Sequence, residues 1–244
     1  MAEGRHVPAL VTEVVRALGP APGRVYVDAT FGGGGYSRAL LESAPCRVWA
    51  IDRDPAALAR GRSLAAAFPG RLTMIEGRFG AMDRLLAAAG VTTIHGVAFD
   101  LGVSSFQLDD PARGFSFQTD GPLDLRMGAD GPTAADVVNR TAEDDLADIL
   151  HRYGEERRAR AVARAIVRAR TAAAITRTGE LADIVRRVVR RSADGIDPAT
   201  RTFQALRIYV NHELEGLDAA LRSLAECLAP GGRLAVIAFH SLED

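Results

Sequence analysis

The chain contains no lysine, only two cysteines, one tryptophan and no long apolar segment. All 30 basic residues are therefore arginine, which excludes a phosphate-binding loop of the G-x-x-x-x-G-K type. Cys46 and Cys227 lie far apart in the sequence and form no metal-ligand pair, so we expect no metal site. No apolar run approaches the ~18 residues that span a bilayer. The N-terminus also lacks the order of a signal peptide, so we expect a cytoplasmic protein.

The most informative segment covers residues 25–37. A short apolar run carries Asp28, four consecutive glycines follow it from Gly32 to Gly35, and a helical pattern then begins. Glycine lets the backbone adopt positive φ and approach a ligand closely. We interpret the segment as a cofactor loop, and a flexible tight turn is the alternative.

Strand and helix patterns alternate around this loop. This alternation predicts a Rossmann-like α/β fold with a mainly parallel sheet, whose strand C-termini share one edge. Strands are expected over residues 25–29, 47–52, 72–76, 96–100 and 233–239, and helices over 7–18, 37–43, 55–68 and 81–89.

The pattern breaks after the fourth strand. Residues 102–132 read as one long loop, and residues 134–191 show helical spacing, which predicts an inserted α-helical domain. We expect a sheet domain in two parts, 1–105 and 198–244, around an insertion over 106–197. In the second part a leucine stripe is expected to pack on the sheet, formed by Leu214, Leu217, Leu221, Leu224 and Leu228.

The glycine spacing does not fit the dinucleotide fingerprint G-x-G-x-x-G, and this favours S-adenosylmethionine. A carboxylate at the end of the second strand, Asp52, would accept the ribose hydroxyls. Asp52 could instead cap the next helix, although Asp54 before Pro55 is better placed for that. Phe79, after the third strand, would cover the adenine or be a plain core aromatic.

Asp100 ends the fourth strand and is the candidate catalytic residue. Neither cysteine lies where a covalent nucleophile would be needed, so direct attack on the methyl group by nitrogen or oxygen is favoured. Such a transfer depends mainly on alignment, and Asp100 could accept an amine N–H and orient its lone pair. The alternative is a turn-forming carboxylate before Gly102.

Charge is distributed unevenly along the chain. Residues 151–191 contain twelve arginines and four acidic residues, a net charge of +8, whereas residues 109–148 carry ten acidic residues and three arginines, a net charge of −7. The basic stretch suits a polyanion such as RNA, or it is a solvated helix face.

Long motifs throughout the chain closely resemble the RsmH (MraW) family, which methylates the exocyclic amine of a cytosine in the decoding region of bacterial small-subunit ribosomal RNA. The motifs are, by residue number, 6–8, 28–32, 50–55, 100–105, 107–110, 113–117, 120–124, 153–157, 200–205 and 239–244.

The resemblance implies a class I methyltransferase fold and a helical insertion that helps to bind RNA. It implies a 30S subunit or late precursor as substrate, with the base leaving its stack to reach Asp100, and it leaves room for a homodimer. The cofactor contacts that it implies are Gly34, Gly35, Tyr36, Asp52, Phe79, Asp100 and Gln107.

Three departures from the family pattern stand out. Tyr36 replaces a common histidine and Phe106 a common proline, which puts fine cofactor contacts in doubt. After Asp100 the chain lacks the D/N/S-P-P-Y/F motif of many amine methylases, so that mechanism does not transfer directly. The match ends at Asp244, so we expect the terminal strands of the sheet to be missing, beside His240, Ser241 and Glu243.

Two other functions compete with an rRNA methyltransferase. One is a catalytically idle RNA-binding assembly factor that retains a cofactor pocket. The other is a small-molecule methyltransferase, which leaves the basic stretch of residues 151–191 unexplained.

Overall fold

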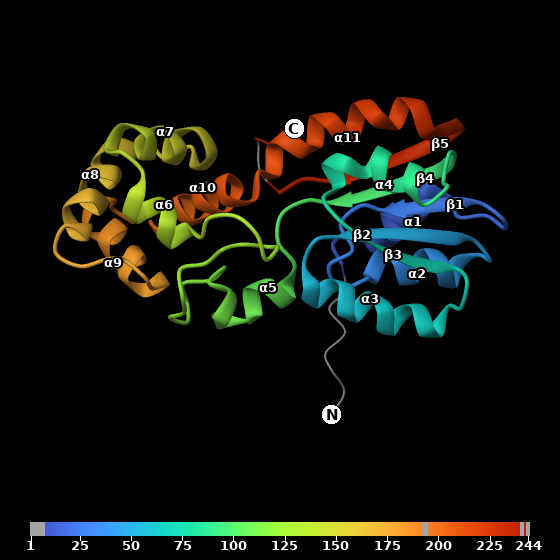
Figure 1. The fold of residues 1–244 in the computed structure, drawn as a ribbon, viewed down its shortest axis with the longest axis horizontal. Coiled ribbons are helices and arrows are strands. Elements are labelled where there is room, and N and C mark those ends of the chain that lie inside the picture. Colours follow the sequence, from blue (N-terminus) through green and yellow to red (C-terminus); the bar gives the residue numbers. More distant parts are fainter. Residues whose placement is uncertain (1–7, 192–194, 240–241, 243–244) are drawn as a thin grey trace. The chain divides into compact units, whose positions relative to one another are not determined.

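The computed structural model describes residues 8–191, 195–239 and 242, and the chain divides into two compact units (Figure 1). The first unit joins Met1–Ser104 to Leu214–Asp244, and the second is Ser105–Glu213. None of the helices in the described ranges combines the length and apolar character that crossing a bilayer requires.

A five-stranded parallel sheet forms the centre of the first unit, with the strand order β3-β2-β1-β4-β5. The predicted Rossmann-like α/β fold is therefore confirmed. The strands are β1 (Val25–Asp28), β2 (Arg47–Asp52), β3 (Leu72–Glu76), β4 (Ile94–Asp100) and β5 (Leu228–Ile237). The helices of this unit are α1 (Val11–Leu18), α2 (Gly35–Ser43), α3 (Pro55–Ala67), the 3-10 turn η1 (Phe79–Ala81), α4 (Met82–Ala88) and α11 (Glu213–Cys227).

Alternate residues of the strands face two separate cores, because successive side chains of a strand point to opposite faces. Tyr26 packs in one core with residues of α1, α2 and α3, and its neighbour Val27 packs in the other with residues of α4 and α11. Figure 1 shows α4 and α11 together on one side of the sheet. Both faces are covered, as a parallel sheet requires.

The ends of the chain's elements differ in detail from the prediction. Val7, expected in the first helix, lies outside the described residues, and α1 begins at Val11. The strand β5 begins at Leu228, earlier than residue 233, with an irregular register against β4 between Ile94 and Gly96.

The leucine stripe of α11 is only partly buried. Leu224 is buried and Leu217 is half-buried against the sheet, whereas Leu221 is 38% exposed, so its predicted packing is wrong. The buried position between Leu217 and Leu224 is Ala220, which lies three residues from one and four from the other. The helix therefore faces the sheet along 217–220–224, and Leu221 points away from it.

The second unit is a bundle of helices around its own core. Its elements are α5 (Ser105–Asp109), the 3-10 turn η2 (Pro111–Arg113), α6 (Ala134–Arg140), α7 (Glu143–Gly154), α8 (Ala159–Arg170), α9 (Thr178–Val188) and α10 (Thr200–Asn211). Apolar residues of α6 to α10 form one continuous cluster that includes Leu146, Val162, Leu181 and Phe203.

The last helix of the bundle changes the second domain boundary. We expected the insertion to end at residue 197, but α10 packs closely on α7 and contributes Phe203 and Leu206 to the helical core. The second unit therefore extends to Glu213.

The expected long loop is built from specific contacts inside the second unit. The Arg113 guanidinium donates to the carbonyls of Arg126 and Met127, at 2.9 and 3.0 Å. Phe115 is buried, and the Phe117 ring packs against Phe203 at 4.7 Å between centroids. These contacts, together with α5 and η2, give much of the segment a defined structure.

Candidate active site

The glycine loop connects β1 to α2 at the carboxyl edge of the sheet. Gly32 and Gly34 have φ values of 51° and 77°, in the left-handed region that favours glycine. A Cβ on Gly34 would lie 2.5 Å from the Phe31 ring, and a Cβ on Gly35 would lie 2.0 Å from Pro8. The loop therefore requires glycine both for its backbone angles and for close contact with neighbouring groups.

Asp28, at the end of β1, connects the start of the loop to α2 through hydrogen bonds. Its buried carboxylate accepts hydrogen bonds from the Ser37 hydroxyl at 2.6 Å and the Ser37 amide at 3.1 Å. Burial raises the pKa of Asp28 to about 6, and the bonds from Ser37 and Thr30 oppose that rise. The sequence predicted Asp28 only as the acidic end of a strand, and Ser37 in the following helix was the available signal for this hydrogen bond.

Asp52 ends β2, the strand next to β1, and its side chain is hydrogen-bonded to the glycine loop. Its carboxylate accepts the amide N–H of Gly32 at 2.8 Å and that of Asp54 at 2.9 Å. Burial raises the pKa of Asp52, and these amide bonds counteract the shift. Asp54 caps α3 by accepting the Ala56 amide at 3.0 Å, so the expected cap is confirmed and Asp52 does not serve as that cap.

Asp100 ends β4 on the other side of β1. Its backbone amide donates to the Thr30 hydroxyl at 2.7 Å, which joins the glycine loop to this strand end. Thr30 was not among the predicted site residues. Its place between Asp28 and the glycines was a signal, but its partner became visible only in the folded chain.

Tyr36 lies under the loop and has an exposed fraction of 3%. Its hydroxyl donates to the Ala9 carbonyl and lies close enough to the Asp100 carboxylate to feel its charge. Burial, followed by the charges of Asp100 and Asp28, raises the pKa of the Tyr36 phenol, so the phenol stays neutral. The structure thus brings Tyr36 and Asp100, two predicted site residues, into contact.

Phe79 and Gln107 are the two remaining predicted contacts of the cofactor. Phe79 follows β3 in η1, is half-buried against the core, and meets Phe99 edge to face at 5.8 Å between ring centroids. These contacts agree with the core role left open above. Gln107 belongs to α5 of the second unit, where its side chain is buried. The predicted neighbours His240, Ser241 and Glu243 lie outside the described residues.

The sheet order explains why these residues suit a cofactor. The chain runs from β1 to β2 on one side, and β4 lies on the other side of β1, so the topological switch point lies between β1 and β4. Ligands of open α/β sheets bind outside the carboxyl ends of the strands at this point. Asp52 and Asp100 flank the glycine loop there, one strand away on each side, which separates the strand ends by about 10 Å.

Comparison with known proteins agrees with this architecture. Residues 3–244 match the MraW methylase family. A relative from Rhodospirillum centenum, named ribosomal RNA small subunit methyltransferase H, is 64% identical over 98% of this chain and 73% of its own length. A relative of the same name from Paramagnetospirillum magneticum is 61% identical over 98% of this chain and 75% of its own length.

A solved structure, described as a putative rRNA-methylase from Clostridium thermocellum, is 21% identical over 41% of this chain and 54% of that chain. Its TM-score of 0.34 is too low to add to the family match. That match covers nearly the whole sequence and includes both units. The resemblance seen in the sequence motifs is therefore confirmed, and this chain belongs to the MraW methylase family.

Proposed function

We propose that this chain transfers a methyl group from S-adenosylmethionine to the exocyclic amine of a cytosine in 16S ribosomal RNA. The observation that carries the proposal is the set of groups at one switch point: a glycine loop flanked by Asp52 and Asp100. The names of the relatives support the ribosomal substrate. An rRNA substrate would place the protein in the cytoplasm.

The residues at the switch point fit S-adenosylmethionine. The positive φ values of Gly32 and Gly34 give the loop a tight turn at the switch point, where a glycine backbone can lie against a ligand. Asp52 accepts two backbone amides and has further lone pairs for ribose hydroxyls. We assign cofactor binding to Gly34, Gly35 and Asp52, with Phe79 and Gln107 as further proposed contacts.

Asp100 is the proposed catalytic residue. S-adenosylmethionine supplies an electrophilic methyl group when bound. Asp100 would accept an N–H of the cytosine amine and so direct the nitrogen lone pair. The buried Tyr36 phenol, which lies near this carboxylate and donates to the Ala9 carbonyl, would act as a positioning residue.

The substitution Asp100→Ala tests this assignment. We expect it to abolish methyl transfer to unmethylated small ribosomal subunits, detected by mass spectrometry of rRNA nucleosides. Calorimetry should still detect cofactor binding, because Asp52 and the glycine loop remain. Asp83→Ala, which removes an exposed carboxylate from α4, is the matched control and should keep full activity. Full activity of Asp100→Ala would remove Asp100 from the mechanism.

The same assay separates the competing functions. Cofactor binding by the wild type without methylation of any ribosomal substrate would favour an idle assembly factor. Comparison of free rRNA, assembled 30S subunits and late precursors as substrates would identify the natural one, which we propose to be a 30S subunit or late precursor. Sedimentation of the wild type would test whether it forms a homodimer.

A further inference from the structure

Seven arginines gather where four helices of the second unit begin or end. The segment between α7 and α8, the end of α9 and the start of α10 are joined by two hydrogen bonds. Arg158 donates to the Val188 carbonyl at 2.6 Å, and Arg201 donates to the Glu155 carbonyl at 3.1 Å. We call this region the basic edge, and its arginines are Arg157, Arg158, Arg160, Arg187, Arg190, Arg191 and Arg201.

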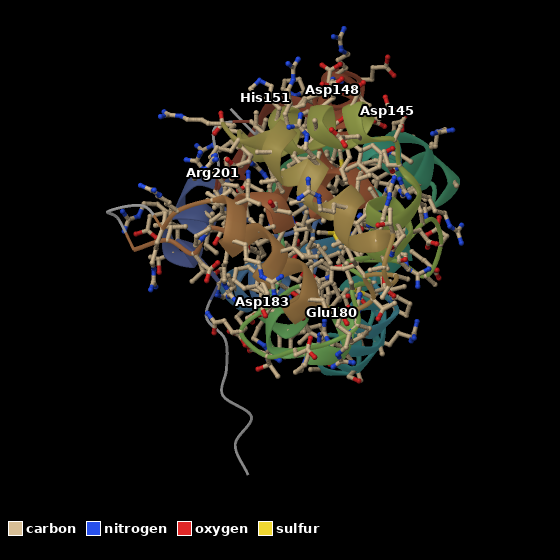
Figure 2. The ribbon with its side chains drawn as sticks, turned by 90° about the vertical axis from the view of Figure 1, so that its left-hand side faces the viewer. Asp145, Asp148, His151, Glu180, Asp183 and Arg201 are labelled. Carbon is tan, nitrogen blue, oxygen red and sulfur yellow. The ribbon has the colours of Figure 1, made fainter. Side chains whose placement is uncertain are left out.

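The segments of the basic edge contain few acidic residues, and the nearby Asp197, which interacts with Arg191, is already paired with Arg186. These segments, residues 155–160, 187–191 and 201, contain seven arginines and two glutamates, which is a net charge of 7 − 2 = +5. One of the two glutamates, Glu156, is buried and accepts the backbone amide of Arg158 at 2.8 Å. Figure 2 shows Arg201 well apart from Asp145 and Asp148 of α7.

Other arginines of the basic stretch hold the fold together. Arg170 donates to the carbonyls of Val138 and Thr141 at 2.7 and 2.8 Å and so ties the end of α8 to α6. Arg186 pairs with Asp197 at 2.9 Å. These contacts give Arg170 and Arg186 a structural role, so neither residue requires a ligand to explain its charge.

In the part of the chain that the structure describes, four arginines of the basic edge make no structural contact of this kind through their side chains. Arg157, Arg160, Arg187 and Arg190 are exposed, and none of their side chains forms a hydrogen bond or ion pair within the described residues. Arg158, Arg191 and Arg201 each bond a single carbonyl and keep further N–H donors.

The arginines at the start of α8 also oppose local helix preference, whereas Arg187 in the last turn of α9 agrees with it. The first turn of α8 contains no acidic residue, and Arg157, Arg158 and Arg160 surround it. The start of a helix carries partial positive charge and favours acidic neighbours. Such a departure from local preference is expected where a function needs it.

We propose that the basic edge binds phosphates of the RNA backbone during substrate recognition. This inference rests on the proposed rRNA substrate and assigns its backbone contacts to Arg157, Arg160, Arg187 and Arg190. Guanidinium groups bind phosphate through paired N–H donors, and such contacts do not depend on base sequence. The basic edge would therefore supply affinity, while the choice of nucleotide lies elsewhere.

The test compares two double variants with the same change in charge. Arg160→Glu/Arg187→Glu alters the basic edge. Arg140→Glu/Arg168→Glu alters two exposed arginines outside the basic edge. Arg140 ends α6, where it pairs with Asp136 at 3.3 Å on the surface, and Arg168 lies in the last turn of α8, about 12 Å from Arg160 along that helix. Binding to unmethylated small ribosomal subunits is measured from about 50 to 200 mM salt. The milder Arg160→Gln/Arg187→Gln is a second test if charge reversal disturbs folding.

We expect the variant of the basic edge to bind about tenfold more weakly. Its log–log salt slope should be smaller by about 1.4 to 1.8, because each of the two lost phosphate contacts removes about 0.7 to 0.9. Cofactor affinity should not change, and the control should stay within about twofold of the wild type.

Three results would overturn the inference: no loss in the variant of the basic edge, an equal loss in the control, or a wild type that does not bind the subunits. Methyl transfer by the wild type is scored separately. Binding that depends on the basic edge, without any methylation, would refute the proposed function and leave the inference intact.

Discussion

Gly34→Ala tests the close packing of the cofactor loop. Gly34 precedes α2 with φ at 77°, and an added Cβ would lie 2.5 and 2.7 Å from two atoms of the Phe31 ring. The same Cβ would lie 3.0 Å from Leu64. Both the backbone angle and the space around it therefore oppose alanine.

The two costs can be added. A left-handed backbone costs alanine roughly 1–2 kcal/mol. Forcing the Phe31 ring aside in a packed core costs about 1–3 kcal/mol more. We therefore expect Gly34→Ala to lower the free energy of unfolding of the first unit by roughly 2–5 kcal/mol.

Gly90 provides a matched control. Its φ is 76°, almost the same as that of Gly34, but a Cβ there would meet nothing within 4 Å. Gly90→Ala should cost only the backbone share, roughly 1–2 kcal/mol. The difference between the two variants then isolates the crowding against Phe31.

Urea denaturation followed by tryptophan fluorescence measures both variants. The only tryptophan is Trp49 in β2, so the signal reports on the first unit, which contains both glycines. Equal losses for Gly34→Ala and Gly90→Ala, at unchanged urea dependence, would refute the crowding argument. A Gly34→Ala protein that is stable and binds S-adenosylmethionine like the wild type would also refute the close approach of the loop to the cofactor.

Two further substitutions test buried polar groups. Burial raises the pKa of Asp28 to about 6 from 3.8, so the folded state favours its protonated form, and stability is lost as pH rises through that range. Between about pH 4 and 7 the wild type should therefore lose about 3 kcal/mol of unfolding free energy that Asp28→Asn does not lose. Urea titrations that show the same difference between the two proteins at all pH values would contradict this. In the second unit, the buried Asn211 amide donates to the Leu125 carbonyl at 2.7 Å and accepts the Met127 amide at 2.8 Å. Asn211→Leu should cost about 2–4 kcal/mol and speed hydrogen exchange at Met127, whereas unchanged protection there would show that other contacts hold this segment.

Much of the fold follows from local signals in the sequence. Asp54 before Pro55 indicated the start of α3, and the cap was found there, because capping involves residues only two positions apart. The alternation of strands and helices predicted a parallel sheet, and its connections place Asp28, Asp52 and Asp100 at one edge.

Other features depend on contacts between distant parts of the chain. Leucine spacing alone did not show that Ala220 would face the sheet in place of Leu221. The second domain boundary moved to Glu213 because α10 packs on α7, which no composition change near residue 197 indicated.

The sequence by itself determined the family, the strand order along the chain and the residue types at the strand ends. These are encoded in short motifs and periodic patterns, so neighbouring residues suffice to detect them. Only the tertiary structure decided that Thr30 bonds the backbone of Asp100, that Tyr36 is buried beside the Asp100 carboxylate, and that some arginines are structural while others remain exposed. The physical reason is that burial and hydrogen-bond partners depend on the whole folded chain, in which residues 70 positions apart are in contact.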